Sequence, residues 1–282
     1  MTSNKVFAEG REREEHGWLV YPRDAQLRRS MYSEELCDAI MTHPAKQQAH
    51  MHKDICEYVS EPGETILDPF GGVGTSLLSA TLGRNVILIE IEDYYVGIIR
   101  RCIDELTAKH TATINDSSVA YPWQYELGRM MVIQSDNRLA MPIPCDHIIT
   151  SPPYGNDLAK EAESAGLTAT IGQQGMQYTK ANQNIGKLQP FIYKQAMQKV
   201  YELMVKSVKV GGTITITHRD RIRDGERILY IDSIVGTLVK LGCSVKMLDK
   251  WKAPGSMAAA VNKSMGLEVV EDEDIIIMER TR

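Results

Sequence analysis

Residues 66–75 read Ile-Leu-Asp-Pro-Phe-Gly-Gly-Val-Gly-Thr, and this stretch decides the fold. The short run from Thr65 to Asp68 predicts a buried β-strand, the glycines predict a tight turn, and Thr75 to Leu82 predicts a helix that ends at Gly83. Glycines between a strand and a helix let a ligand approach the backbone closely, because a side chain there would collide with it. The stretch therefore predicts a ligand site in a fold of alternating strands and helices.

The glycine turn does not match the two common phosphate-binding motifs. A dinucleotide-binding turn would have a third glycine where Leu77 stands, and a P-loop would have Gly-Lys-Ser/Thr, which is absent. A nucleoside-type ligand remains, with its ribose hydroxyls bound by an acid that ends the next strand, where Glu90 stands. Asp68 would point into the same crevice, where a cationic or hydrogen-bonding ligand would compensate its burial. The alternative is a plain tight turn, with Glu90 capping the helix that begins near Tyr94.

The alternation of strands and helices continues along the chain. Further strands are predicted at 86–90, 131–134, 147–150, 213–217, 244–248 and 275–278. Helices are predicted at 45–58, 94–106, 192–208 and 225–241. Residues 210–212, Val-Gly-Gly, predict the turn into the strand at 213–217. Seven strands alternating with helices predict an α/β protein with a mainly parallel, doubly wound sheet.

The composition is that of a globular chain. The 282 residues are 43% hydrophobic and 24% charged, which excludes the disordered, collagen-like and coiled-coil classes. The length fits one large domain at 42–282, preceded by a polar arm or extension at 1–41. The first thirty residues lack the apolar run of a signal peptide, and no run of about 18 apolar residues occurs. We therefore expect a cytoplasmic protein without a membrane segment.

The cysteines and histidines do not predict a metal site. The five cysteines are scattered and contain no C-x-x-C pair, so neither disulfides nor structural zinc are expected. His43, His50 and His52 are grouped too loosely for metal ligands without a carboxylate at matching spacing.

The charge is unevenly distributed. The chain carries 32 Lys and Arg against 37 Asp and Glu, a net charge of −5, which alone argues against a nucleic-acid partner. Between Ser151 and Met265, however, there are 16 Lys and Arg against 9 Asp and Glu, a net charge of +7, which leaves −12 elsewhere. This basic part is suited to a polyanion, although solvated helix faces explain the count equally well.

A second turn follows the predicted strand that ends at Thr150, and it reads Ser-Pro-Pro-Tyr-Gly at 151–155. Two consecutive prolines fix the backbone and lack N–H groups, so nearby carbonyls stay free to accept hydrogen bonds. The Ser151 hydroxyl and the Pro152 carbonyl would accept from an exocyclic amino group, while the Tyr154 ring stacks on a planar base. This turn predicts a site for a base amine.

Both turns resemble the motifs of one family. DPFGGVGT at 68–75 and TSPPYG at 150–155 resemble the D-P-F-x-G-x-G-T and [S/D/N]-P-P-[Y/F] motifs of the S-adenosylmethionine-dependent DNA amino-methyltransferases. Residues 42–46 are similar to the segment that precedes the glycine motif in these enzymes, and 209–212 resemble their helix-to-strand turn. The resemblance covers residues 42–280 in outline, and the order of its motifs is that of circularly permuted members.

The resemblance implies a Rossmann-like class I methyltransferase fold, S-adenosylmethionine as the cofactor, and roles for single residues. Within it Glu90 matches the ribose-binding acid and Asp136 the adenine-contacting acid. Implied cofactor-binding residues are His43, Pro44, Lys46, Asp68, Pro69, Phe70, Gly72, Gly74, Thr75, Glu90, Asp136 and Ser151. Implied catalytic residues are Ser151, Pro152, Pro153 and Tyr154.

The resemblance also implies a target. A serine at 151 is most often found with cytosine, so methylation of cytosine N4 in double-stranded DNA is expected; adenine N6 in DNA and guanine N2 in RNA are alternatives, as is a module that binds without turnover. A ring-carbon methyltransferase would need a Pro-Cys nucleophile after the strand, but Pro144-Cys145 precedes it. No covalent intermediate is therefore expected.

Reaching the amine in a duplex requires base flipping, at a cost that phosphate contacts must offset. Candidate DNA-binding residues are Lys180, Lys187, Arg219, Arg221, Arg223 and Arg227, with ordinary surface charge as the alternative. The segment 156–189, rich in Gly, Gln, Asn, Ala and Ser, predicts a flexible insertion that orders on DNA. The resemblance leaves open a homodimer and a cognate restriction endonuclease as further partners.

Overall fold

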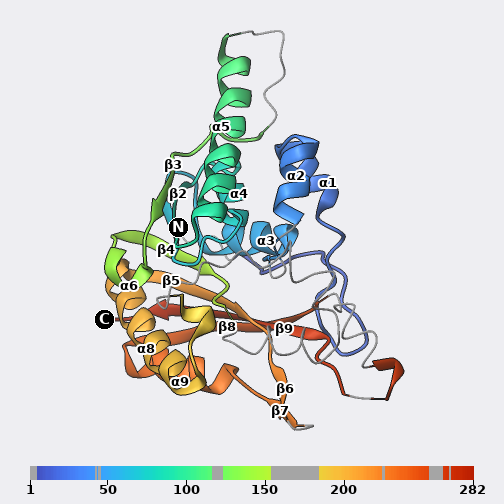
Figure 1. Ribbon diagram of the computed structural model, residues 1–282, viewed down its shortest axis with the longest axis vertical. Helices are drawn as coiled ribbons and strands as arrows, with labels where there is room; N and C mark the ends of the chain where they lie inside the picture. The colour runs from blue at the N-terminus through green and yellow to red at the C-terminus, as the bar shows by residue number, and fades with distance from the viewer. Residues whose placement is uncertain are drawn as a thin grey trace. The chain divides into compact units, whose positions relative to one another are not determined.

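The chain forms two compact units. The computed structural model describes residues 5–41, 43, 46–115, 123–153, 184–223, 226–253, 263–266 and 268–282. The first unit comprises Met1–Glu9 and Pro22–Thr150, and the second comprises Gly10–Tyr21 and Ser151–Arg282 (Figure 1). The Ser-Pro-Pro turn begins at the residue where the second unit resumes.

The first unit combines a parallel sheet with helices. Its strands are β1 (Thr65–Asp68), β2 (Asn85–Glu90), β3 (Met130–Gln134) and β4 (Cys145–Thr150). Its helices are α1 (Ala25–Met31), α2 (Glu34–Met41), α3 (Ala49–Val59), the 3₁₀ turn η1 (Thr75–Leu77), α4 (Leu78–Thr81), α5 (Asp93–Asn115) and α6 (Asn137–Ala140).

The strand order in this unit is β3-β2-β1-β4, with every pair parallel. Leu67 of β1 lies opposite Ile87 of β2 and Ile148 of β4. The central strands read as continuous apolar runs because helices cover them: Ile66, Leu67 and Ile148 are 0% exposed. Parallel strands share a carboxyl edge, so the turns that follow β1, β2, β3 and β4 all leave the sheet there.

The second unit is built around an antiparallel sheet. Its strands are β5 (Val208–His218), β8 (Cys243–Lys252) and β9 (Asp272–Arg280), in the order β5-β9-β8, and a separate hairpin pairs β6 (Arg221–Arg223) with β7 (Glu226–Ile228). Its helices are the 3₁₀ turn η3 (Ile185–Lys187), α8 (Pro190–Ser207) and α9 (Ile231–Lys240). Figure 1 shows the hairpin extending beyond β5.

The fold class is the predicted one. Four strands in the first unit and three in the second make up the seven-stranded, mostly parallel, Rossmann-like α/β fold. All seven predicted strands are present, although β5, β8 and β9 extend beyond their predicted ends. No helix among the described residues is long and apolar enough to cross a membrane.

Three local predictions were wrong. The predicted helix 225–241 begins only at Ile231, because Glu226–Ile228 pairs with Arg221–Arg223 as a hairpin. The predicted turn at 210–212 lies inside β5, where Gly211 adopts a positive φ of 80° without ending the strand. Helix α5 continues beyond the predicted end at residue 106 and ends at Asn115.

The N-terminal stretch is divided between the two units. Helices α1 and α2 belong to the first unit, with Leu36 and Ile40 fully buried. In the second unit, the backbone of Leu19 donates to the Lys250 carbonyl and accepts from Lys252 N, each at 2.8 Å. The described residues of the predicted arm therefore contribute to the core.

Candidate active site

The glycine turn leaves β1 at the carboxyl edge in a conformation that requires glycine. Gly72 and Gly74 have φ values of +52° and +81°, which L side chains rarely adopt. A Cβ on Gly74 would also lie 3.2 Å from side-chain carbons of Leu77 and Ile99. A Cβ on Gly72 would have the ring of His43 as its nearest neighbour, at 3.8 Å. The turn is therefore both strained for other residues and open beside Gly72.

Asp68, the last residue of β1, holds the glycine turn through hydrogen bonds. Its Oδ1 accepts hydrogen bonds from Phe70 N at 3.0 Å and Thr150 Oγ1 at 2.7 Å, and its Oδ2 accepts from Ser76 Oγ at 2.5 Å. The residue is 6% exposed, and burial raises its pKa while the three donors oppose the rise. These donors compensate the burial of Asp68, for which the sequence predicted a cationic or hydrogen-bonding ligand.

Glu90 ends β2 and is bonded to the glycine turn. Its Oε2 accepts from Gly72 N at 2.7 Å, and its Oε1 accepts from Ile91 N and Glu92 N at 2.8 and 2.9 Å. Burial raises the pKa of Glu90 to about 7, against these backbone donors. Glu90 therefore binds the glycine turn on one side and, on the other, the two residues that precede α5, without a hydrogen bond to an N–H group of that helix.

Asp136 and Asn137 follow β3 at the same carboxyl edge, and Asn137 contacts the glycine-turn segment. Asp136 caps α6 through Arg138 N and also pairs with the Arg138 guanidinium at 2.6 Å, which lowers its pKa although burial opposes this. Asn137 is 6% exposed, and its Nδ2 donates to the Pro69 carbonyl at 2.9 Å. Its Oδ1 is buried without a hydrogen-bond partner among the described residues. The edge therefore contains an unsatisfied acceptor beside the glycine turn.

The segment before α3 reaches the turn from the other side. His43 is 8% exposed and stacks edge-on against Tyr95 with ring centroids 4.6 Å apart. Burial lowers the pKa of Lys46, and the neighbouring Arg28 lowers it further. Arg28 in turn donates to Thr75 Oγ1 at 3.2 Å. Pro44 lies outside the described residues.

The predicted cofactor residues of the first unit that the structure describes gather at one edge. Hydrogen bonds join Asp68 to Phe70 and to Ser76, the residue after Thr75, and another joins Glu90 to Gly72. The sequence did not single out four further residues that donate hydrogen bonds to this edge. They are Ser76, Thr150, Asn137 and Arg28. Ser76 and Thr150 neighbour the two motifs, whereas nothing marks Arg28 within its Arg-rich surroundings.

The Ser-Pro-Pro turn opens the second unit's main segment. The Pro153 carbonyl accepts from the Tyr193 hydroxyl at 2.7 Å, and a Cβ on Gly186 would lie 3.2 Å from Pro153 Cβ. Within the described residues, no hydrogen bond involves the Ser151 hydroxyl or the Pro152 carbonyl. Pro153 is therefore anchored while the two predicted acceptors keep their capacity. Tyr154 lies outside the described residues.

The predicted basic residues differ in what they contact. Arg227 pairs with Asp220 at 2.8 Å and with Asp272 at 2.6 Å, carboxylates whose side chains are 1% exposed. Arg221 lies over the Tyr230 ring, 5.9 Å from its centroid. Arg219 and Lys187 are partly exposed.

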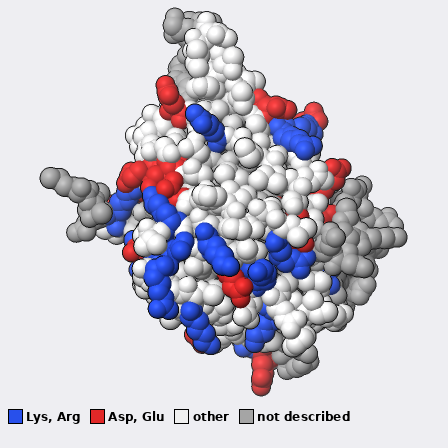
Figure 2. Space-filling model, turned by 90° about the vertical axis from the view of Figure 1, so that its left-hand side faces the viewer, with Lys and Arg blue, Asp and Glu red and all other residues white. Residues whose placement is uncertain are grey.

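Two of the predicted basic residues are described only in part or not at all. Lys180 lies outside the described residues, and of Arg223 only the backbone is described, in β6. Figure 2 shows Lys and Arg side chains more densely in the lower half of the view.

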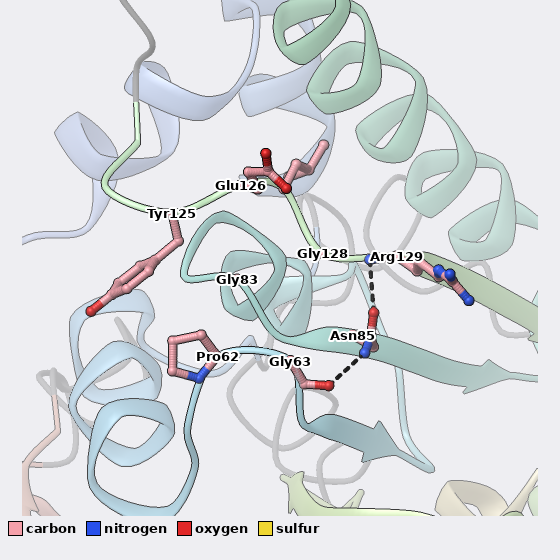
Figure 3. Close-up of a pocket in the computed structure, with 9 residues that line it drawn as sticks. Pro62, Gly63, Gly83, Asn85, Tyr125, Glu126, Gly128 and Arg129 are labelled. Atoms are coloured by element: carbon pink, nitrogen blue, oxygen red, sulfur yellow. Dashed lines mark hydrogen bonds between the residues drawn. The ribbon is translucent and has the colours of Figure 1, made fainter.

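A separate hollow lies at the opposite edge of the first unit's sheet (Figure 3). Its lining includes Gly63, which precedes β1, Asn85, which begins β2, and Arg129, which precedes β3. Asn85 closes its floor, donating to the Gly63 carbonyl at 2.8 Å and accepting from Arg129 N at 3.1 Å. These are the amino ends of the strands, so the hollow is not part of the glycine-turn edge.

Comparisons with known proteins point to methyl transfer. The N6_N4_Mtase family model, described as DNA methylase, matches residues 9–101, which contain the glycine turn and Glu90. No curated protein matches the chain significantly.

Several solved structures are similar in fold. A SAM-dependent methyltransferase from Methanosarcina mazei shares 12% identity over 80% of this chain and 97% of that chain, with a TM-score of 0.48. An rRNA methylase from Streptococcus thermophilus shares 13% identity over 84% and 99%, with a TM-score of 0.46. TrmN from Thermus thermophilus shares 13% identity over 88% and 53%, with a TM-score of 0.46.

The match across the glycine turn and the seven-stranded α/β fold together support a methyltransferase that uses S-adenosylmethionine.

Proposed function

We propose that this protein transfers a methyl group from S-adenosylmethionine to the exocyclic amine of a flipped base in double-stranded DNA, with cytosine N4 as the target. The observation that carries the proposal is the hydrogen bond from Thr150 to Asp68. It fixes the end of β4 to the carboxylate beneath the glycine turn, and Ser151 is the next residue of the chain. The cofactor turn and the start of the amine-binding turn thus leave the sheet at one edge.

The residues at this edge fit the cofactor. Its adenine amine is a donor suited to the unsatisfied Asn137 Oδ1, beside the paired carboxylate of Asp136. Its ribose hydroxyls are donors suited to Glu90, and the missing side chain at Gly72 leaves room for close approach. When bound, S-adenosylmethionine supplies an activated methyl group on a positively charged sulfur.

The Ser-Pro-Pro turn would then activate the amine. The lone pair of a cytosine amine is delocalised into the ring, so the nitrogen is a poor nucleophile. Acceptance of its protons by Ser151 Oγ and the Pro152 carbonyl favours a pyramidal nitrogen with its lone pair free. The Tyr193 bond to the Pro153 carbonyl holds this turn in place. Most of the rate enhancement comes from positioning, because no covalent step is needed.

The buried cysteines support an amine rather than a ring carbon as the target. Cys145 begins β4 at the amino edge of the sheet, and burial raises its pKa to about 12. A thiol in that state is not a nucleophile near neutral pH. The choice of cytosine rests on Ser151, and adenine N6 and guanine N2 are the alternative targets.

Phosphate contacts are proposed for part of the basic set. Lys187, Arg219 and Arg221 belong to segments that follow the carboxyl ends of β4 and β5. Arg227 is excluded from the set, because two buried carboxylates bind its guanidinium. The remaining cations would offset the cost of flipping the base.

Nucleoside mass spectrometry tests the proposal. Duplex DNA of mixed sequence is incubated with S-adenosylmethionine and the protein, and a parallel reaction contains Ser151→Ala. We expect 4-methylcytosine with the wild type and far less with the variant. 6-Methyladenine as the sole product would overturn the cytosine assignment, and methylation of RNA alone would overturn the DNA assignment. Cofactor binding without methylation of either would favour a non-catalytic binding module.

A further inference from the structure

Arg28 is a buried cation beside the glycine turn. It belongs to helix α1 and is 3% exposed. Its Nε donates to Asp24 Oδ2 at 2.9 Å, and its Nη2 donates to the Gln47 carbonyl at 3.0 Å and to Thr75 Oγ1 at 3.2 Å. One side chain thus joins the N-terminal helix, the segment before α3 and the glycine turn.

We propose that Arg28 is a positioning residue of the cofactor site, which holds Thr75 and the 46–48 segment where they receive the amino-acid end of S-adenosylmethionine. This inference rests on the proposed function and deepens it. It gives the N-terminal helix a role in cofactor binding, although the sequence places residues 1–41 outside the catalytic domain.

The charges on the two sides of the turn support this orientation. The side after β2 and β3 carries Glu90 and Asp136, which are acceptors for hydroxyl and amine protons, and the one guanidinium described there, that of Arg138, pairs with Asp136. The other side carries Arg28 and Lys46, and the carboxylate of Asp24 pairs with Arg28. The only anionic group of S-adenosylmethionine is the carboxylate of its amino-acid end, so it fits the side with the excess positive charge.

The hydrogen bonds of Arg28 explain why a guanidinium is needed. Its acceptors come from three separate segments, and the planar fork of arginine reaches them in fixed directions. A lysine ammonium on a flexible stem cannot hold all three at once. Gln47 is also tied to the core, because its Oε1 lies 2.7 Å from Nδ1 of the buried His52. A shift of Arg28 would therefore be passed to both the turn and the adjoining segment.

Two ligands distinguish a role of Arg28 in positioning the amino-acid end of the cofactor from a purely structural role. S-adenosylhomocysteine carries the amino-acid end, whereas 5′-methylthioadenosine has the same nucleoside and sulfur without it. Calorimetry on the full chain measures both affinities for the wild type, Arg28→Met and Arg29→Met. Arg29 is the matched control, because it is the next residue of α1 and is exposed.

We expect Arg28→Met to weaken S-adenosylhomocysteine binding about tenfold or more, with less than about twofold change for 5′-methylthioadenosine. Arg29→Met should change neither. Equal losses for both ligands, or no loss for either, would overturn the inference and leave the proposed function standing. Failure of the wild type to bind either ligand would overturn both.

A second pair of variants tests the Thr75 hydroxyl, which accepts a hydrogen bond from Arg28. Thr75→Val loses the hydroxyl that accepts from Arg28, and Thr75→Ser keeps it. We expect Thr75→Val to show the same ligand-selective loss, and Thr75→Ser, which keeps the accepting hydroxyl, to lose less affinity for S-adenosylhomocysteine than Thr75→Val. This pair decides the inference if Arg28→Met fails to fold, and equal behaviour of the two variants would contradict it.

Discussion

Thr150 Oγ1 donates a hydrogen bond to Asp68 Oδ1 across 2.7 Å, which joins the last residue of β4 to the last residue of β1. The two strands are parallel neighbours, with Leu67 opposite Ile148, so the bond closes their shared carboxyl edge. Asp68 also binds Phe70 N and Ser76 Oγ. One carboxylate therefore sets the glycine turn and restrains the residue from which the Ser-Pro-Pro turn begins.

Removing the Thr150 hydroxyl should destabilise this edge. Thr150→Val leaves the buried Asp68 carboxylate with one donor fewer, which we expect to lower the free energy of unfolding by about 1–3 kcal/mol. Thr150→Ser keeps the donor and should lose less. Urea unfolding of both variants measures the difference, and equal stabilities would show that the hydroxyl contributes nothing.

Ser151 and Asp68 should divide the work between turnover and cofactor binding. We expect Ser151→Ala to lower turnover about 10- to 100-fold with little change in cofactor affinity, because it removes one acceptor for the amine protons. Asp68→Ala should weaken cofactor binding, because the donors of Phe70, Ser76 and Thr150 lose their common acceptor. Calorimetry and single-turnover kinetics measure the two effects. Equal losses of affinity in both variants would refute the division.

Cofactor affinity should depend on the ionisation of Glu90. Burial raises its pKa to about 7, with a smaller contribution from the charge of Glu92. Only the carboxylate accepts protons from both ribose hydroxyls, so binding at lower pH must release a proton. We expect the affinity for S-adenosylhomocysteine to fall about tenfold from about pH 8 to about pH 6. Calorimetry across this range should give a flat profile for Glu90→Gln.

The same residue predicts a stability change in the free protein. The folded state binds the Glu90 proton more tightly than the unfolded chain does, because the pKa of this carboxyl is near 4.5 in the unfolded chain. Its contribution is therefore fully present below about pH 4.5 and is lost as the pH rises through about 7. The difference in unfolding free energy between wild type and Glu90→Gln should follow this direction. A difference that is constant with pH would contradict the shift.

Arg219 and Arg227 should behave oppositely in DNA binding. Arg219→Ala should weaken binding to all sequences and reduce the slope of log affinity against log salt by about 0.9, as expected for one lost phosphate contact. Arg227→Ala should leave the slope unchanged and lower stability instead, because it leaves Asp220 and Asp272 unpaired. Fluorescence anisotropy at several salt concentrations separates them. A reduced slope for Arg227→Ala would restore it to the DNA-contacting set.

The sequence predicted the buried strands of the first unit most closely. β1 has its predicted bounds and β2 begins one residue early, because parallel strands covered on both faces read as short apolar runs between turns. The prediction of a helix at 225–241 was wrong for its first residues, because strand pairing overrides their local helical pattern. Residues 226–228 suit a helix locally, but Arg221–Arg223 pairs with them and Arg227 binds two distant aspartates.

The candidate site shows the same limit. Motif positions such as Asp68 and Glu90 could be found because their residue types and spacing are specific. Arg28 could not, because its hydrogen-bond acceptor Thr75 lies 47 positions away and five arginines occur in the same stretch. The sequence likewise made Arg227 a candidate for DNA contacts, because it gives no sign that Asp272 pairs with this guanidinium.

The contact between Gly186 and Pro153 has an evolutionary consequence. The chain that leaves Pro153 is back beside it at Gly186, and α8 then starts at Pro190 with Tyr193 bonded to the Pro153 carbonyl. A stretch whose two anchor points adjoin can be exchanged, lengthened or shortened at small entropic cost without moving either anchor. The length of the stretch between these two anchors can therefore change in related chains while the hydrogen bond that holds the Pro153 carbonyl is kept.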